Sequence, residues 1–120
     1  MPTQHNYHYN EICEIRSIFK DIDEKYKYLR TKLTLGSVGE DKKLAQVRYD
    51  LYLINSSLKT LTSIEAYIIT QTFRNDGNVC NEWWRGIFSK TTYYRIRIRA
   101  ITKFLKEYHA CIRRSHSLQH

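Results

Sequence analysis

The residues best suited to chemistry crowd into one short segment, 85–99, near the C-terminal end. They are Arg85, Ser89, Lys90, Thr91, Thr92, Tyr94, Arg95, Arg97 and Arg99. Guanidinium and ammonium groups neutralise phosphates or read guanine edges, and hydroxyl groups add shorter hydrogen bonds to a nucleic acid. This combination predicts contact with double-stranded DNA.

The net charge of the chain is concentrated in the same region. Residues 83–120 hold nine Lys and Arg and a single acid, Glu107, whereas residues 1–82 balance eleven basic with eleven acidic side chains, so the whole formal charge of +8 belongs to the C-terminal part. Clustered cations displace the counterions condensed on a phosphate backbone, so an anionic partner is favoured. The alternative is that the basic end only keeps the chain in solution.

The elements that must position these residues follow a helix-turn-helix order between Leu61 and Leu105. A capping box at 62–65 starts a helix, Gly77 ends it, a short segment follows at 79–85, and Ser89 caps a basic helix over 90–113. The capped end points free amides and a positive dipole outward. The first two turns, 90–95, then occupy the part of a recognition helix that reaches base edges. We expect Tyr93 to enter the core and Tyr94 to be exposed.

The segments "SIEAYIITQTF" (63–73) and "FSKTTYYRIRIRAITKFL" (88–105) resemble the last two helices of sigma-factor region 4 and of the ArpU/RinA-type phage late transcriptional regulators. The matching residues are Ser89, Thr92, Tyr93, Tyr94, Arg95, Ala100 and Ile101. The ending is also similar to that of a family of small mycoplasma proteins. The turn at 86–89 is one residue longer than the family pattern, and Trp83 and Trp84 are bulkier. The resemblance implies DNA binding and contact with RNA polymerase.

The N-terminal half has the pattern of an antiparallel helical hairpin over 10–61. Apolar residues recur at helical spacing through 11–35, a Gly-rich break follows at 36–39, and a heptad-like repeat runs from Leu44 to Leu61. We expect one compact all-α domain of about five helices, in which the hairpin packs on a helix-turn-helix at 62–113. The ends, 1–9 and 114–120, are predicted to be disordered.

Two other interpretations of the chemical segment stay open. Residues 95–99 alternate basic and apolar side chains with period two, which is also the pattern of a half-buried strand. Trp83 and Trp84 could stack on bases of a single strand, although adjacent residues on a helix point about 100° apart, so one is expected in the core. Arg85 beside them is either a phosphate contact or an ordinary surface residue.

No enzyme or cofactor signature is present, and the chain is predicted not to be an enzyme. It has no Gly-rich phosphate loop, GxSxG or HExxH. The His residues lie near the two ends, and the three Cys lack metal-ligand spacing, so no metal site or disulfide is expected. No stretch approaches the roughly 20 apolar residues of a membrane span, and the polar start is unlike a signal peptide. We therefore expect a cytoplasmic protein without membrane contact.

The sequence favours a small transcriptional regulator that binds double-stranded DNA sequence-specifically. In this interpretation the hairpin positions the DNA-binding module, forms a homodimer or docks on RNA polymerase. One alternative is a helical protein-interaction module with a basic solubilising end. Another is RNA or ribosome binding, or the DNA-packaging role of a small terminase subunit.

Overall fold

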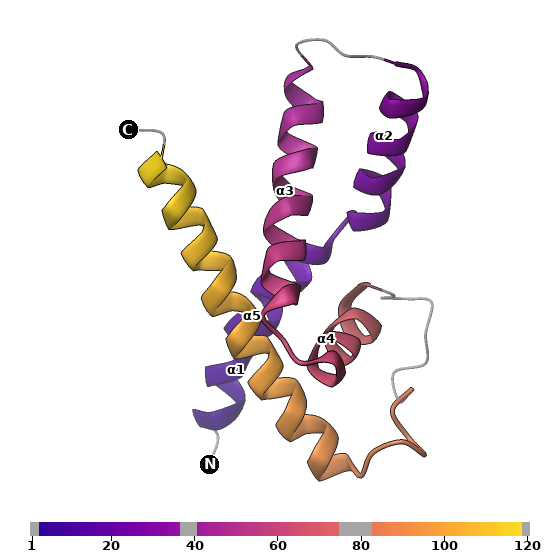
Figure 1. Ribbon diagram of the computed structural model, residues 1–120. Helices are drawn as coiled ribbons and strands as arrows, with labels where there is room; N and C mark the ends of the chain where they lie inside the picture. The colour runs from indigo at the N-terminus through magenta and orange to yellow at the C-terminus, as the bar shows by residue number, and fades with distance from the viewer. Residues whose placement is uncertain (1–2, 37–40, 75–82, 119–120) are drawn as a thin grey trace.

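The computed structural model describes residues 3–36, 41–74 and 83–118, and its regular elements are all helical (Figure 1). In chain order they are α1 (Thr3–Phe19), α2 (Ile22–Thr34), α3 (Lys42–Lys59), α4 (Ser63–Ile69), a π-helical turn η1 (Thr70–Arg74) and α5 (Lys90–Leu118). No strand occurs in these described ranges. The all-α prediction is confirmed, and residues 95–99 are helical, so the strand interpretation was wrong.

The first predicted helix is not continuous, because the chain bends at Asp21. Asp21 adopts a left-handed conformation with φ of 60°, a region that Asp tolerates better than most residues. Phe19 and Ile22, on either side of the bend, are both 3% exposed. Residues three positions apart share one face of a helix, so the burial of both side chains does not itself require a bend. The bend instead lets α1 pack against α5 while α2 packs against α3. The apolar spacing alone predicts one helix from 11 to 35 and does not record this difference in packing.

Helices α2 and α3 lie side by side and antiparallel, and a carboxylate fastens them together (Figure 1). Asp41 caps α3 by accepting the Leu44 amide at 3.1 Å, and it also accepts the Tyr28 hydroxyl at 2.9 Å and pairs with Lys32 at 3.2 Å. The Leu44 amide and then the Tyr28 hydroxyl lower the pKa of Asp41 to about 2. The hairpin is thus held by a network whose charges are balanced.

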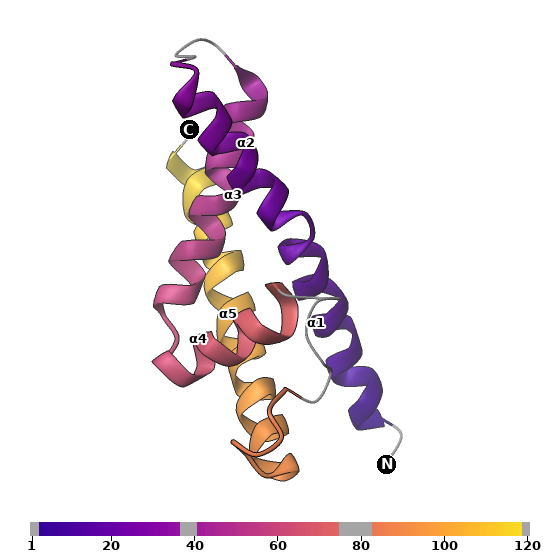
Figure 2. The same ribbon diagram turned by 90° about the vertical axis from the view of Figure 1, so that its right-hand side faces the viewer.

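The longest helix, α5, is the element on which the others pack. It contacts α1, α3 and α4, and Figure 2 shows it running through the middle of the molecule. Its buried residues, Tyr93, Ala100, Ile101, Phe104, Leu105 and Cys111, follow helical spacing. Phe104 is fully buried, with its ring 5.5 Å from that of Phe19 on α1. One face of α5 is therefore committed to the core.

Two helices extend into ends that were predicted to be disordered. Helix α1 begins at Thr3, inside the stretch 1–9, and α5 continues to Leu118, inside the stretch 114–120. Near the end of α5, Arg114 pairs with Glu107 at 2.7 Å. Such a pair supports the last turns of a helix but leaves no trace in hydrophobic periodicity.

The predicted capping box at the start of α4 is confirmed. The Thr62 hydroxyl accepts the Glu65 amide at 3.3 Å, and the Glu65 carboxylate accepts the Thr62 amide at 2.9 Å. Farther along, the short segment predicted at 79–85 lies partly outside the described residues, and 83–85 form a turn rather than a helix. Gly86 takes a φ of 87° in that turn. Regular helix is therefore seen only before and after it.

Candidate nucleic-acid interface

Ser89 begins α5 as its sequence position predicts. Its hydroxyl oxygen accepts the Thr92 amide at 3.2 Å and donates to the Thr92 hydroxyl at 2.8 Å, while its carbonyl accepts the Tyr93 amide at 2.9 Å. An amide bonded in this way is no longer available to a ligand, but the amides of the first turn ahead of it have no helical partner. Ser89 and Thr92 are therefore hydrogen-bonded to each other, and their structural role is to cap the start of α5.

The side chains that project from the first two turns of α5 are Lys90, Thr91, Tyr94 and Arg95, all of them exposed. Tyr94 is 40% exposed, whereas Tyr93 is 2% exposed, as predicted for both. Arg85 is exposed in the turn that precedes the helix. The structure thus brings five predicted contact residues to the surface around one helix end.

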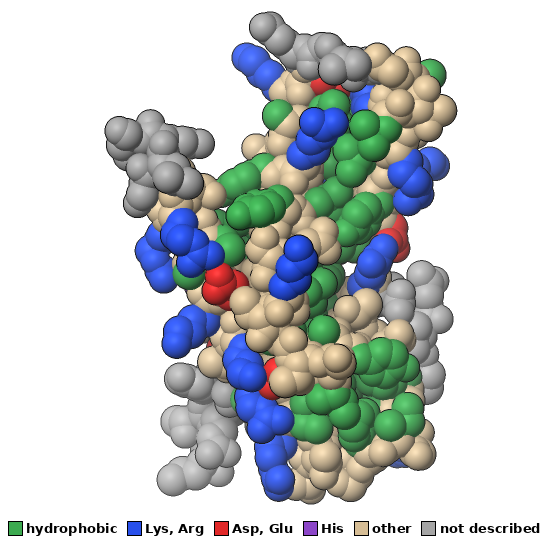
Figure 3. Space-filling model, viewed as in Figure 1, with side chains coloured by type: hydrophobic (Ala, Val, Ile, Leu, Met, Phe, Trp, Pro, Cys, Tyr) green, Lys and Arg blue, Asp and Glu red, His purple; other side chains and the backbone are tan. Residues whose placement is uncertain are grey.

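A line of basic residues continues along the solvent side of α5, well past the predicted site. It consists of Arg95, Arg99, Lys103, Lys106 and Arg113, all exposed, and is called the basic stripe below. Figure 3 shows Lys and Arg side chains following this helix on the viewed face. At 1.5 Å per residue the stripe is about 27 Å long. Spacings of three, four and seven along the sequence are the signal of this stripe.

Two members of the basic stripe are held by a buried carboxylate. Glu65 is 1% exposed, and its oxygens accept the Arg99 Nε–H at 3.1 Å and the Lys103 ammonium at 3.1 Å. Burial alone would raise the pKa of Glu65, but the Thr62 amide and the Lys103 ammonium keep it below its ordinary value. Arg99, predicted as a DNA contact, therefore also fastens α5 to α4.

Arg97 is turned toward the protein rather than along the basic stripe. It is half-buried, and its guanidinium carbon lies 5.7 Å from the ring centroids of both Phe73 and Tyr94. Guanidinium groups bind aromatic faces favourably at this distance. Arg97 was predicted to contact DNA together with Arg95 and Arg99, but its place among aromatic rings separates it from them.

The tryptophan pair belongs to an aromatic cluster between α4 and α5. Trp84 is 6% exposed and stacks on Tyr93, with ring centroids 4.8 Å apart and planes at 12°. Trp83 is half-buried and meets Tyr67 edge-on at 5.5 Å. The Tyr93 hydroxyl and Thr72 share a hydrogen bond of 2.9 Å. One Trp in the core and one partly exposed matches the expectation, and a pair that stacks on bases is contradicted.

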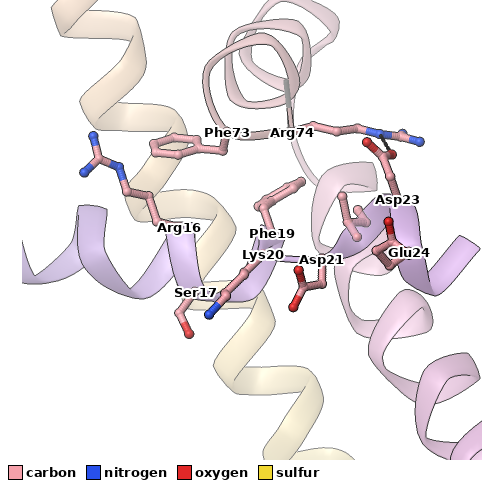
Figure 4. Close-up of a pocket in the computed structure, with 10 residues that line it drawn as sticks. Arg16, Ser17, Phe19, Lys20, Asp21, Asp23, Glu24, Phe73 and Arg74 are labelled. Atoms are coloured by element: carbon pink, nitrogen blue, oxygen red, sulfur yellow. Dashed lines mark hydrogen bonds and ion pairs between the residues drawn. The ribbon is translucent and has the colours of Figure 1, made fainter. Parts of the chain in front are cut away.

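A hollow at the bend between α1 and α2 has a different character. It has a volume of about 620 Å³, and Figure 4 shows Phe19 and Phe73 among the residues that line it. Its charged lining is mixed and consists of Arg16, Lys20, Asp21, Asp23, Glu24 and Arg74. Arg74 reaches Asp23 at 3.3 Å. The hollow thus lacks the one-sided charge of the α5 surface.

Comparison with known proteins identifies no relative: no family model, curated protein or solved structure matches this chain. Within the described ranges, no three His, Cys, Asp or Glu side chains come together as a metal site would require. None of the helices described is long and apolar enough to cross a membrane. The surface of α5 itself is therefore the ground for assigning a function.

Proposed function

We propose that the protein is a small transcriptional regulator that binds double-stranded DNA through the exposed face of α5. The observation that carries the proposal is the basic stripe, which lies on a helix whose opposite face is anchored in the core. A rigid helix with cations on one side presents fixed charges to a phosphate backbone, and release of condensed counterions then drives binding.

In this proposal α5 makes two kinds of contact with DNA, each from a different part of the helix. The first turns of α5, with Lys90, Thr91 and Tyr94 exposed, supply side chains that can reach base edges. The basic stripe supplies phosphate contacts that orient the protein on the duplex. Its length of about 27 Å corresponds to roughly eight base pairs at 3.4 Å each. In this proposal α4, the turn at 83–88 and α5 act as the helix-turn-helix, and the α2–α3 hairpin is its scaffold.

Fluorescence anisotropy with a labelled mixed-sequence duplex, followed across several salt concentrations, tests the proposal. Five phosphate contacts predict a slope of log affinity against log salt of about −4.5. Arg95→Glu with Lys106→Glu should weaken binding more than about tenfold and make the slope shallower by about 2, because two contacts are lost. Arg99 is left unchanged, since a carboxylate at that position would face the buried Glu65.

The matched control reverses the same number of charges on the hairpin. Lys42 and Arg48 are exposed on α3, so Lys42→Glu with Arg48→Glu changes the net charge equally. We expect a much smaller loss of affinity and an unchanged salt slope for this control. Equal losses in the two double variants would reduce the effect to net charge, and an absence of binding at low salt would refute DNA binding altogether.

A further inference from the structure

A second surface, beside the basic stripe, is apolar rather than charged. Ile64 and Tyr67 lie one turn apart on α4 and are 43% and 48% exposed. Trp83, Phe88 and Ile96 are partly buried against the same cluster of Ile68, Trp84 and Tyr93. These five residues, Ile64, Tyr67, Trp83, Phe88 and Ile96, are called the apolar patch below. Figure 3 shows hydrophobic side chains gathered over α4, directly beside the line of basic residues.

Among the residues that the structure describes, the segments that form the apolar patch expose charge of one sign. Across the described residues 61–74 and 83–106 the only acid is Glu65, which is buried. Its two partners at the edge of the patch, Arg99 and Lys103, keep side chains 57% and 46% exposed. A ligand that covers the patch therefore meets apolar surface in the middle and positive charge along one side.

We infer that the apolar patch docks an acidic amphipathic helix of a partner protein. Such a helix places apolar side chains at spacings of three and four on one face, and its flanking carboxylates would meet Arg99 and Lys103. A second copy of this chain is disfavoured as the occupant, because it would bring like charges together. A nucleic-acid strand needs a row of exposed rings, whereas Tyr67 is the one exposed aromatic residue of the patch. This inference does not depend on DNA binding.

A synthetic peptide of about five helical turns, with Leu on one face and Glu elsewhere, is the probe. The chain contains two Trp residues, Trp83 and Trp84, one within the apolar patch and the other in the cluster beneath it, so tryptophan fluorescence reports occupation of this surface. We expect saturable binding that is at least about tenfold tighter than that of the same peptide with Lys in place of Glu.

Substitutions then locate the binding surface. Ile64→Ser with Tyr67→Ser should weaken binding of the Glu peptide about tenfold or more, since both side chains lose apolar contact. Leu33→Ser with Tyr52→Ser is the matched control, because these residues are 60% and 58% exposed on the hairpin, and it should bind as the unchanged protein does. All the substituted side chains are exposed, and circular dichroism verifies that each variant keeps its helices.

Three results would overturn the inference. Equal affinity for the Glu and Lys peptides would remove the role of charge, and equal affinity of the two double variants would move the binding site elsewhere. Failure of the Glu peptide to bind would be decisive on its own. If oligo(dT) then binds and is lost in Ile64→Ser with Tyr67→Ser, the patch serves single-stranded DNA. Self-association lost in that variant would instead identify a second copy as the occupant.

Discussion

The α2–α3 hairpin and the α4–α5 end of the molecule both carry many Lys and Arg residues but pair them differently. In the hairpin, Lys25 lies 3.1 Å from Asp50, and Lys32 lies 3.2 Å from Asp41, so cations and carboxylates fasten one helix to the other. At the other end, the single carboxylate of Glu65 serves two cations. No described acid pairs with Arg95, Lys106 or Arg113.

The difference shows why a count of basic residues is a poor guide to a binding surface. A cation that has a carboxylate beside it contributes little to the long-range field, whereas uncompensated cations on one helix face add their potentials. Residues 22–59 of the hairpin hold eight Lys and Arg with five acids, whereas residues 90–118 hold eight with one acid, so the outer face of α5 is the surface that favours an anion.

The largest effect is expected at Glu65, the buried carboxylate that joins α4 to α5. Glu65→Ala removes the bond to the Thr62 amide and the anchor of Arg99 and Lys103. We expect the free energy of unfolding to fall by about 2–3 kcal/mol, less than for a fully buried pair because both cations can turn to water. Urea denaturation measures this change.

Glu65→Gln provides the control for the loss of charge alone. The amide keeps an oxygen that can accept the Thr62 N–H, so a smaller loss than in Glu65→Ala is expected. A change below about 0.5 kcal/mol in Glu65→Ala would mean that this cluster does not hold α5 in place, since ordinary surface substitutions give changes of that size.

The contribution of Asp41 to the stability of the hairpin should appear in the pH dependence of unfolding. Because the folded protein lowers the pKa of Asp41 from 3.8 to about 2, the stabilisation from this group is complete above about pH 3.8 and is lost as the pH falls through about 2. In Asp41→Asn the fall in stability over this range should be shallower. Thermal melts between pH 2 and 5 measure it, and Glu24→Gln on α2 should keep the slope of the unchanged protein. Identical slopes in Asp41→Asn and the unchanged protein would contradict the role given to Asp41.

Substitution of Arg95 and of Arg97, two neighbouring arginines of α5, should have different effects on DNA binding. Arg95→Ala is expected to make the salt slope shallower by about 0.9, since one phosphate contact is lost. Arg97→Ala should leave that slope unchanged and instead reduce the free energy of unfolding by about 0.5–1 kcal/mol, because its guanidinium lies over Phe73 and Tyr94. Anisotropy and denaturation on both variants provide the comparison. A slope that changes equally in the two variants would place Arg97 on the DNA side.

Small effects of opposite sign are expected at Gly86 and Asp21, where the backbone has a positive φ. Gly86→Ala should destabilise the protein by about 1 kcal/mol, because φ of 87° is strained for Ala although its Cβ would meet no atom within 4 Å. Asp21→Gly should stabilise it by about 0.5 kcal/mol, since Gly adopts the left-handed conformation without strain. Thermal denaturation resolves both changes, and two effects of the same sign would show that something other than φ decides.

The local features of the fold could be predicted from the sequence wherever neighbouring residues decide them. The capping pair of Thr62 and Glu65 and the cap at Ser89 depend on residues three positions apart, and both form as expected. The contrast between Tyr93 and Tyr94 follows from the helical period of α5. DNA binding and the likeness to sigma-factor region 4 stay predictions, because no family model, curated protein or solved structure matches the chain.

Features that depend on distant residues could not be predicted in this way. The bend at Asp21 results from the separate packing of α1 on α5 and α2 on α3, which no local pattern records. The partner of Arg99 is Glu65, 34 positions away, so the local sequence predicts an exposed cation and does not show the ion pair. By contrast, Lys106 and Arg113 lie inside the helix predicted over 90–113 and continue its basic face at helical spacing, so the sequence alone could have placed them in the site.

By itself, the sequence determined that the chain is helical, where two of its helices are capped, and that its positive charge gathers near the C-terminal end. Propensity, capping and composition act over a few residues, so a linear sequence contains them in full. The tertiary structure alone decided which of those cations are free, because a charge is compensated only when folding brings a carboxylate beside it. Glu65 contacts Arg99 and Lys103 across 34 and 38 positions of sequence, whereas Arg95, Lys106 and Arg113 are exposed on α5 without a described acid beside them.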